Sequence, residues 1–220
     1  MDAPPGRPPT PRGGEESGRE PVTVRKATRA DAGALVDVLV RSFDADPVVN
    51  WFVRQDERRA EGFEVFFDMA VRQLTLPHGE VYTTSDRAGA ALWVPPGKSR
   101  MGWARQLLLL PRGLRVAGPR GLPRNLRSLA ALDRLHPRWP HLYLMFIGVH
   151  PDQQGRGIGS ALMRPVVEQC DRTGLSAYLE GTAEDNVRLY ERFGFRTVQQ
   201  LALPGGGPTS WLMWRMPATG

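Results

Sequence analysis

The chain has 220 residues, of which 41% are hydrophobic and 24% charged, so it is long enough for one domain with a sizeable core and is not disordered throughout. No apolar run approaches the roughly 18 residues that a membrane-spanning helix needs. The single cysteine, Cys170, excludes an intramolecular disulfide framework and a cysteine-based zinc cluster. The four histidines show no metal-binding spacing, and we therefore expect no metal site.

The net charge of +6 comes from one segment of the chain. Between residues 100 and 140, nine arginines face a single acid, Asp133, and the remainder carries slightly more acidic than basic residues. The arginines alternate with leucines at helical spacing, which predicts an amphipathic helix whose leucines cover the core and whose arginines stay in water. We therefore expect neither a nucleic acid nor a membrane as the partner.

The first half of the chain predicts a tail followed by strands and helices. Residues 1–21 are rich in Pro and Gly and are expected to be disordered. They lack the apolar stretch of a signal peptide, so a cytoplasmic location is expected. One folded domain is expected over residues 22–217. Its first elements are a strand at 22–27, a helix capped by Thr28 or Asp31, a helix over about 57–74, and strands at 79–84 and 89–94.

The second half begins with a helical insertion at about 100–138, which reads as short helices broken at Pro111, Pro119 and Pro123. We expect this insertion to roof a substrate pocket. The remaining elements are an apolar strand at 142–149, a helix to about residue 172, a strand at 176–180, a short helix at about 183–193, and strands near 195–202 and 210–216. This alternation predicts a mixed α/β domain.

The turn after the apolar strand at 142–149 is suited to bind a ligand. Gly155, Gly157 and Gly159 separate the strand from a helix, so backbone N–H groups can face an anion at the positive end of the helix dipole. The spacing fits neither a Walker loop nor a full dinucleotide fingerprint. The turn therefore predicts a diphosphate cradle, and an ordinary glycine turn is the alternative.

Two motifs resemble one family. The run from Gln154 to Gly159 resembles the first signature of the GNAT superfamily of N-acetyltransferases, and the run from Asp185 to Phe195 resembles the second, in the expected order. The resemblance implies a mostly antiparallel central sheet flanked by helices, and acetyl-CoA as the cofactor. Further segments resemble the bacterial branch that includes puromycin N-acetyltransferase: Ser42–Pro47, His136-Pro137, Pro140-His141 and Tyr190–Phe195.

The resemblance also implies cofactor contacts. Main-chain groups of Ile147 and Val149 would hold the thioester and its arm. Asn186 would bond that arm, with helix capping as its alternative role, and Arg192 would approach a phosphate unless it is simply a solvated surface residue. The residues implied at the diphosphate are Gln154, Gly155, Arg156, Gly157, Ile158, Gly159 and Ser160.

Transfer to an amine also needs a proton acceptor and a proton donor. Tyr190 matches the family's general acid, although a tyrosine on an amphipathic helix is often only packed. Glu180 ends an apolar strand where the acceptor must enter, so it is a candidate base or an ordinary strand-end charge. Asp44 and Asp46 are the other acids expected near the acceptor. The aromatic candidates for its wall, with core packing as the alternative for each, are Trp51, Tyr82, Trp93 and Tyr143.

The sequence thus predicts an acetyl-CoA-dependent enzyme that acetylates a primary amine of a small molecule, for example an antibiotic such as an aminonucleoside. A protein or peptide acceptor remains an alternative. A CoA-binding regulator without catalysis on the same fold is a second one. The resemblance is compatible with a homodimer.

Overall fold

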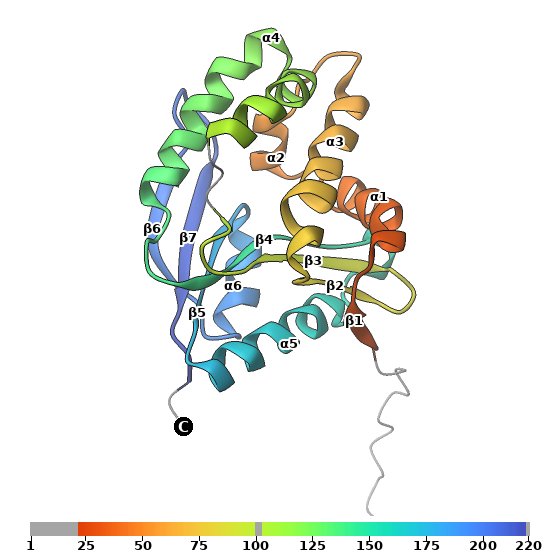
Figure 1. Cartoon of the computed structure of the whole chain (residues 1–220), viewed down its shortest axis with the longest axis vertical. Helices are drawn as coiled ribbons and strands as arrows, with labels where there is room; N and C mark the ends of the chain where they lie inside the picture. The colour runs from red at the N-terminus through yellow and green to blue at the C-terminus, as the bar shows by residue number, and fades with distance from the viewer. Residues whose placement is uncertain (1–21, 100–102, 219–220) are drawn as a thin grey trace, which may run out of the picture.

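The computed structural model describes residues 22–99 and 103–218, with the side chains of 103–108 excepted, so the expected tail at 1–21 lies outside the described part. Seven strands form one sheet in the order β1-β2-β3-β4-β5-β7-β6 (Figure 1). Every neighbouring pair is antiparallel except β4 and β5, which run parallel. The expected mixed α/β fold with a mostly antiparallel sheet is confirmed.

The strands lie close to their predicted positions, since each short apolar run between turns can pair without help from distant residues. The shortest of them, β1, runs along one edge of the sheet, and β6 forms the other edge. Their bounds are Val24–Lys26 (β1), Val81–Thr84 (β2), Gly89–Val94 (β3), His141–Val149 (β4), Ser176–Gly181 (β5), Arg196–Ala202 (β6) and Thr209–Arg215 (β7).

Six α-helices connect the strands in the described part of the chain. The helix expected at 57–74 is α3 followed by a π-helical stretch, Met69–Thr75. Short 3-10 turns precede α1, α5 and β2. The helix bounds are Ala32–Ser42 (α1), Pro47–Phe52 (α2), Arg59–Asp68 (α3), Trp103–Leu135 (α4), Ile158–Thr173 (α5) and Glu184–Glu191 (α6).

Helix α2 was not predicted, because Asp46-Pro47 reads as a turn. In the structure Asp46 is the N-cap of this helix, and its carboxylate accepts the N–H groups of Val48 and Val49 at 3.0 and 2.9 Å. Pro47 occupies the first helical position, where a missing N–H costs nothing. The residues that suggested a turn therefore start a helix.

The expectation of short helices broken at three prolines is confirmed at Pro119 and wrong at Pro111 and Pro123. Helix α4 contains Pro111, Pro119 and Pro123, yet its one non-helical residue is Gly118, with φ of 67° and ψ of 168°. Pro119 directly follows this kink and begins the second segment, so its missing N–H is one that a helix start leaves unbonded anyway. The insertion thus consists of two helical segments, labelled together as α4, that meet at the kink at Gly118.

The expected orientation of α4 is confirmed only in part. Leu110, Leu126 and Leu129 are 44–53% exposed, although they were expected to face the core, whereas Leu132 is half-buried and packs against a core cluster. Polar contacts also hold the helix, because the Asn125 side chain donates to the Phe52 carbonyl at 2.6 Å and the buried Ser128 hydroxyl accepts from the Trp51 ring N–H at 3.2 Å. Hydrogen bonds to α2 thus decide which side of α4 is buried.

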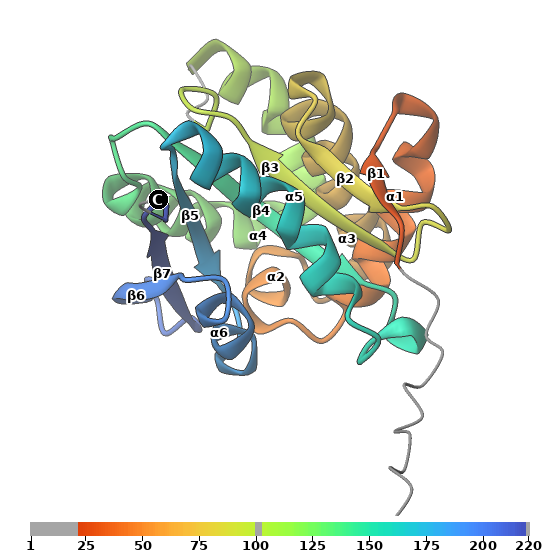
Figure 2. The ribbon, with the colours of Figure 1, turned by 90° about the horizontal axis from the view of Figure 1, so that it is seen from below.

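The helices divide between the two faces of the sheet. Figure 2 shows α5 crossing one face, with α1, α3 and α4 on the other. The α5 side packs Trp93, Leu162 and Leu179, and the other side packs Leu39 and Phe67. Residues of both cores are almost fully buried, so the sheet is covered on both faces as an α/β arrangement requires.

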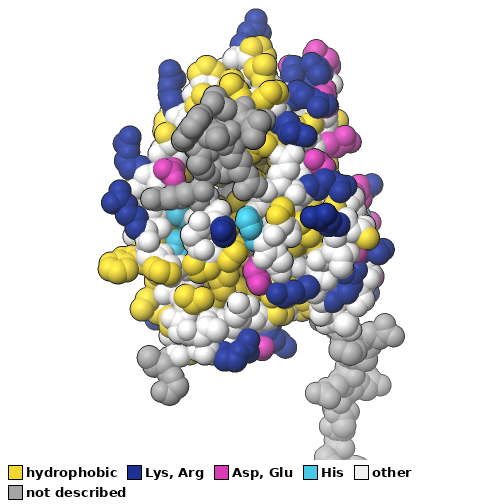
Figure 3. All heavy atoms as spheres, viewed as in Figure 1, with side chains coloured by type: hydrophobic (Ala, Val, Ile, Leu, Met, Phe, Trp, Pro, Cys, Tyr) yellow, Lys and Arg dark blue, Asp and Glu magenta, His cyan; other side chains and the backbone are white. Residues whose placement is uncertain are grey.

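The arginines of the insertion do not form an isolated basic patch. Arg115 of α4 pairs with Glu61 of α3 at 2.7 Å, and Glu61 also pairs with Arg58. Figure 3 shows Lys and Arg side chains spread over the visible face, with acidic side chains beside them at the upper right. At Arg115 the charge of the insertion is therefore matched by an acid of a neighbouring helix.

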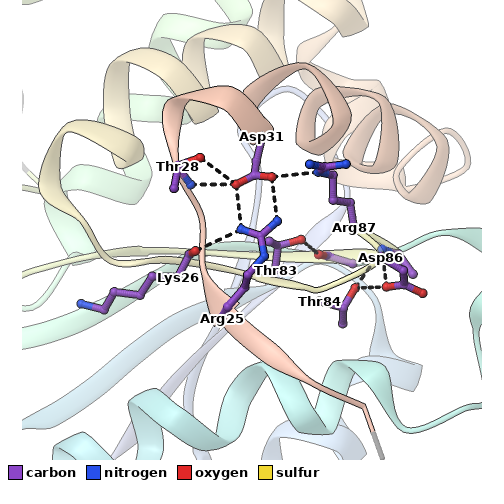
Figure 4. Close-up of polar contacts among 10 residues, drawn as sticks. Arg25, Lys26, Thr28, Asp31, Thr83, Thr84, Asp86 and Arg87 are labelled. Atoms are coloured by element: carbon purple, nitrogen blue, oxygen red, sulfur yellow. Dashed lines mark hydrogen bonds and ion pairs between the residues drawn. The ribbon is translucent and has the colours of Figure 1, made fainter. Parts of the chain in front are cut away.

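A buried carboxylate joins β1, α1 and the β2–β3 turn (Figure 4). Asp31, 2% exposed, accepts two hydrogen bonds from Arg25 and one from Arg87, all at 2.8 Å. It also accepts the backbone N–H of Thr28 at 2.9 Å. These donors, led by Arg25, hold the pKa of Asp31 well below its usual range.

Asp31→Asn should therefore destabilise the fold by about 2 kcal/mol at pH 7, because two arginines lose their charged partner. Since the native pKa is lowered, this contribution is complete above the unfolded-state value of about 3.9 and shrinks as the pH falls below it. Urea unfolding at pH 7, 5 and 3 measures the difference. Asp37→Asn, on the exposed side of the same helix, is the matched control and should cost under about 0.5 kcal/mol. Equal losses in the two variants would contradict the assignment.

Candidate active site

The site is organised by the point at which two parallel strands separate. β4 and β5 pair from His141↔Ser176 to Leu144↔Leu179 and no further. At that point β4 also contains a bulge, since Leu92 pairs with Phe146 while Trp93 pairs with Leu144. Beyond the bulge β4 continues beside β3 alone, so its other edge carries peptide groups without a strand partner.

The backbone N–H groups of Val149 and Ile147 point into this opening. The N–H of His150 donates to the Ala88 carbonyl at 2.8 Å on the β3 side, whereas the N–H of Val149 donates to the Ser42 hydroxyl at 3.2 Å on the opposite side. Because successive peptide groups alternate along a strand, the N–H of Ile147 points the same way as that of Val149. It therefore points away from β3, and the pairing with β5 ends at Leu144↔Leu179, so neither neighbouring strand of the described chain pairs with it. Ser42 had been singled out only as part of the resemblance.

The glycine turn lies where β4 meets α5. Gly155 and Gly157 have φ of 72° and 81°, the left-handed region that glycine adopts without strain. Within the described part of the chain, the backbone N–H groups of residues 155–160 donate no hydrogen bond. A cluster of free donors at a helix N-terminus is suited to bind an anion.

Side chains of the turn leave this space open. No atom lies within 4 Å of a Cβ built on Gly155 or Gly157. Arg156 is exposed and bonds Gln153, while the Gln154 amide donates to the Val149 carbonyl at 3.3 Å. Ile158 is buried and anchors the first turn of α5, so the donors are held in place by the core.

Tyr190 comes from α6 and lies beside the end of β5. Its ring is 7% exposed, packs at 6.3 Å from the Phe195 ring, and would be 3.8 Å from a Cβ on Gly181. Its hydroxyl makes no hydrogen bond within the described residues. Burial and then the Asp46 carboxylate raise the pKa of Tyr190, so the hydroxyl keeps its proton over the physiological range.

The other predicted residues of this helix region are exposed. Asn186 is at the third position of α6, and the N-cap is Ala183, so the capping alternative for Asn186 does not apply. The side chains of Asn186 and Arg192 are exposed and make no hydrogen bond or ion pair within the described residues, so they are available to a ligand. Leu189, one residue before Tyr190, lies 3.7 Å from a Cβ on Gly159, which places α6 next to the start of α5.

Glu180 lies on the other face of the sheet from Tyr190. The Tyr143 hydroxyl donates to Glu180 Oε2 at 2.9 Å, and the Tyr178 hydroxyl donates to Oε1 at 3.2 Å. Both tyrosines have a raised pKa, mainly because they are buried, and stay protonated. Because adjacent residues of a strand point to opposite faces, Glu180 faces α4 while Gly181 faces Tyr190. The acid and the phenol thus flank the opening from its two sides.

Two histidines that are isolated in the sequence join this cluster. His136 follows α4, and its Nδ1 lies 3.7 Å from Glu180 Oε1. Its Nε2 lies 3.2 Å from Nε2 of His141, the first residue of β4. The sequence analysis named both histidines only as part of the resemblance to the puromycin branch and gave them no role in the site.

The remaining acceptor candidates do not all gather here. Asp46 bonds Thr182 just after β5 and so lies near Tyr190, and burial raises its pKa. Asp44 is exposed and paired with Arg59 at 2.8 Å.

Of the four aromatic candidates, the structure brings only Tyr143 to Glu180. Trp51 packs under Arg124 of α4. Tyr82 and Trp93 lie in the core beneath α5, on the face of the sheet opposite to Glu180, so they form no wall with Tyr143. Their apolar surroundings explain them as core residues, which was the alternative for each.

Comparisons with known proteins show what the chain is similar to. The sequence model of the Acetyltransferase (GNAT) family matches residues 126–195. A Corynebacterium glutamicum structure named histone acetyltransferase HPA2 and related acetyltransferase is 27% identical, with a TM-score of 0.71 over 90% of this chain and 98% of that one. The chain has the GNAT acetyltransferase fold. Both matches support a GNAT superfamily acetyltransferase.

Other relatives extend the comparison. An uncharacterized N-acetyltransferase of Schizosaccharomyces pombe is 32% identical over 137 residues, 57% of this chain, and the match spans about half (54%) of that relative. Arylalkylamine N-acetyltransferase 2 from Aedes aegypti has the same fold at 13% identity, with a TM-score of 0.61 over 90% of this chain and all of that one. In the described part of the chain no helix is long and apolar enough to cross a membrane.

Gly157→Ala tests the anion cradle. The variant forces a Cβ into a left-handed position and should cost about 1 kcal/mol of stability, and it should also weaken CoA binding by roughly tenfold because the N–H groups shift. Gly174→Ala is the matched control, since Gly174 has φ of 70° at the other end of α5. It should cost the same stability and leave CoA affinity unchanged. Calorimetric titration with CoA, with thermal unfolding alongside, separates the two effects, and equal CoA affinities would contradict the assignment.

Proposed function

We propose that the chain is an acetyl-CoA-dependent N-acetyltransferase that moves an acetyl group directly to a primary amine of a small molecule. The observation that carries this proposal is the free N–H of Ile147, which points into the opening between Glu180 on one face of the sheet and Tyr190 on the other. A donor flanked by an acid and a phenol has the parts that acyl transfer to an amine needs.

The residues present fit the cofactor. Free N–H groups at residues 155–160 suit a diphosphate, and the open space over Gly155 and Gly157 admits one. The unpaired edge of β4 offers main-chain groups at Ile147 and Val149 to an extended amide-containing arm. For Val149 to bond this arm, the Ser42 hydroxyl must give up its hydrogen bond.

Acetyl-CoA supplies the acetyl group as a thioester, whose carbonyl carbon is open to attack by a neutral amine. The N–H of Ile147 would orient and polarise the carbonyl oxygen from a fixed position in the strand, which costs no reorganisation. This role depends on the backbone alone and explains why an ordinary core side chain occupies position 147.

Glu180 would accept the proton of the incoming ammonium. An alkyl amine has a pKa near ~10.4 and is mostly protonated at neutral pH, so a proton acceptor within reach is required. Two tyrosine hydroxyls already donate to the Glu180 carboxylate, which fixes its orientation. Aromatic rings around a carboxylate also attract an ammonium group.

Tyr190 would protonate the departing thiolate. Its raised pKa keeps the hydroxyl protonated, and no described group competes for it. The ring is fixed between Gly181 and Phe195, so the hydroxyl position is preset. Proton acceptor and donor on opposite faces of the opening fit direct transfer without an acetylated enzyme residue.

A small-molecule acceptor is favoured by the composition of the cluster at Glu180, which combines one acid with several aromatic rings. Structures with the same fold include the Aedes enzyme and a Drosophila melanogaster polyamine N-acetyltransferase that forms N-acetylagmatine. The resemblance to the puromycin branch extends the proposal to aminonucleoside antibiotics. A protein acceptor is the second candidate, supported by the name of the Corynebacterium structure.

Incubation with acetyl-CoA, a thiol reagent and separate amines tests the activity. Agmatine, tryptamine, puromycin and a peptide with a free N-terminus cover the acceptor classes. We expect CoA release with at least one small amine and none without an acceptor. CoA binding without release for any amine would contradict the proposal and favour a CoA-binding regulator.

Tyr190→Phe and Glu180→Gln should each lower kcat by roughly 100-fold, with little change in the affinity for acetyl-CoA. The matched controls are Tyr82→Phe and Glu80→Gln, because the Tyr82 hydroxyl donates to Glu80 at 3.1 Å in a similar pair away from the opening. Both controls should keep the wild-type kcat. An unchanged kcat in Tyr190→Phe would remove this hydroxyl from the mechanism, and the same result in Glu180→Gln would remove the carboxylate.

A further inference from the structure

His136 and His141 form a contact that the mechanism above does not use. Their exposed fractions are 9% and 5%, and their Nε2 atoms are 3.2 Å apart. The His136 ring meets the rings of Tyr143 and Tyr178 edge-on, each at 5.0 Å between centroids. Burying two imidazoles beside a carboxylate costs desolvation free energy, and packing alone gives no reason for this cost.

The partners of His141 assign its proton. Its Nδ1 lies 2.6 Å from the Trp139 carbonyl oxygen, which can only accept, so Nδ1 carries the hydrogen. Burial, the largest cause, lowers the pKa of His141, and the neutral ring then has a lone pair on Nε2. The 3.2 Å contact therefore requires the hydrogen on Nε2 of His136.

This assignment decides what His136 presents to Glu180. With its hydrogen on Nε2, a neutral His136 has its basic lone pair on Nδ1, 3.7 Å from Glu180 Oε1. The other described groups that contact the carboxylate are the hydroxyls of Tyr143 and Tyr178, which donate to it. Among these neighbours, only His136 can take a proton from Glu180.

We propose that His136 receives the proton that Glu180 takes from the acceptor amine, and that His141 holds His136 in the tautomer able to do so. This inference rests on the proposed function. An N–H bond of the ammonium breaks as an O–H bond forms on Glu180, and this O–H bond breaks as an N–H bond forms on His136 Nδ1. The resulting imidazolium faces the restored carboxylate, and its proton passes to solvent when the product leaves.

The distance and the surroundings fit this role. A separation of 3.7 Å is longer than a hydrogen bond, and contacts of this kind shorten when a catalytic site is filled. The groups facing His136 are Glu180 and Tyr178 from β5 together with Tyr143 and His141 from β4. Glu180 is the charged one, so an imidazolium here gains its main stabilisation from that carboxylate. His136 acts through Glu180 and is thus a positioning residue, as is His141.

The tautomers can be measured without turnover. Long-range ¹H–¹⁵N correlation spectra of the full chain at pH 8 should show His141 with its hydrogen on Nδ1 and His136 with its hydrogen on Nε2. A His136 hydrogen on Nδ1 would overturn the proposal.

The kinetic arm uses whichever amine of the panel gives the fastest CoA release. His136→Gln should lower kcat by roughly 30-fold, leave the KM for acetyl-CoA within twofold, and remove one ionisation from the pH profile of kcat/KM. Imidazole added to His136→Ala should restore part of kcat. His78→Gln, in the turn before β2, is the matched control and should behave as wild type.

The outcomes separate the two proposals. If the wild type releases no CoA with any amine, the proposed function fails, and the spectra still decide the tautomers. If the wild type is active while His136→Gln keeps the wild-type kcat and pH profile, the relay fails and the proposed function stands. A His136→Gln variant that loses activity only through a lowered Tm, with no imidazole rescue of His136→Ala, also contradicts the relay.

Discussion

The separation of β4 from β5 is the constraint on which the rest of the site depends. Parallel pairing ends at Leu144↔Leu179, and a bulge in β4 occurs at the same level. A buried N–H must find a partner, so the free edge beyond this point is costly unless a side chain or a ligand pairs with it. Ser42 pairs with one of these groups, and in the proposed function a ligand would pair with the N–H of Ile147. The proposed binding site is thus a place where strand pairing ends early.

The same strands also place the proposed proton acceptor and proton donor on opposite faces of the sheet. Because residues alternate across a sheet, consecutive positions at the end of β5 address opposite sides: Glu180 faces the helical insertion, and Gly181 makes room for Tyr190. The segments on the two faces supply different groups. Helix α6 supplies the phenol of Tyr190, and the residue after α4 supplies the imidazole of His136. The insertion thus reaches the Glu180 cluster through His136, which follows α4, whereas Arg115 pairs with Glu61 of α3 and Arg124 lies over the Trp51 ring.

Prediction from the sequence succeeded where neighbours in the chain decide the structure. Strands with apolar runs and α5, with its glycine start, were placed to within a few residues. It failed in two places. Asp46 was expected in a turn but caps α2, because an Asp-Pro pair suits either structure. Leu110, Leu126 and Leu129 of α4 are exposed, and Asn125 and Ser128 bond α2, which is distant in the chain. Prolines also led to wrong helix boundaries, because the sequence alone does not distinguish a proline that starts a helix from one that ends it.

The sequence by itself determined the glycine turn, its place between a buried strand and a helix, and the tyrosine helix that follows. These features are encoded by consecutive residues and need only local geometry. The tertiary structure decided which side chains share the opening: it collected Tyr143, Glu180 and His136 from three segments and left Trp93 and Tyr82 in the core beneath α5. The spacing of these residues in the sequence does not reveal this arrangement. A bulge changes which face of a strand the later residues point to, and the kink in α4 determines where the end of the helix, and so His136, lies.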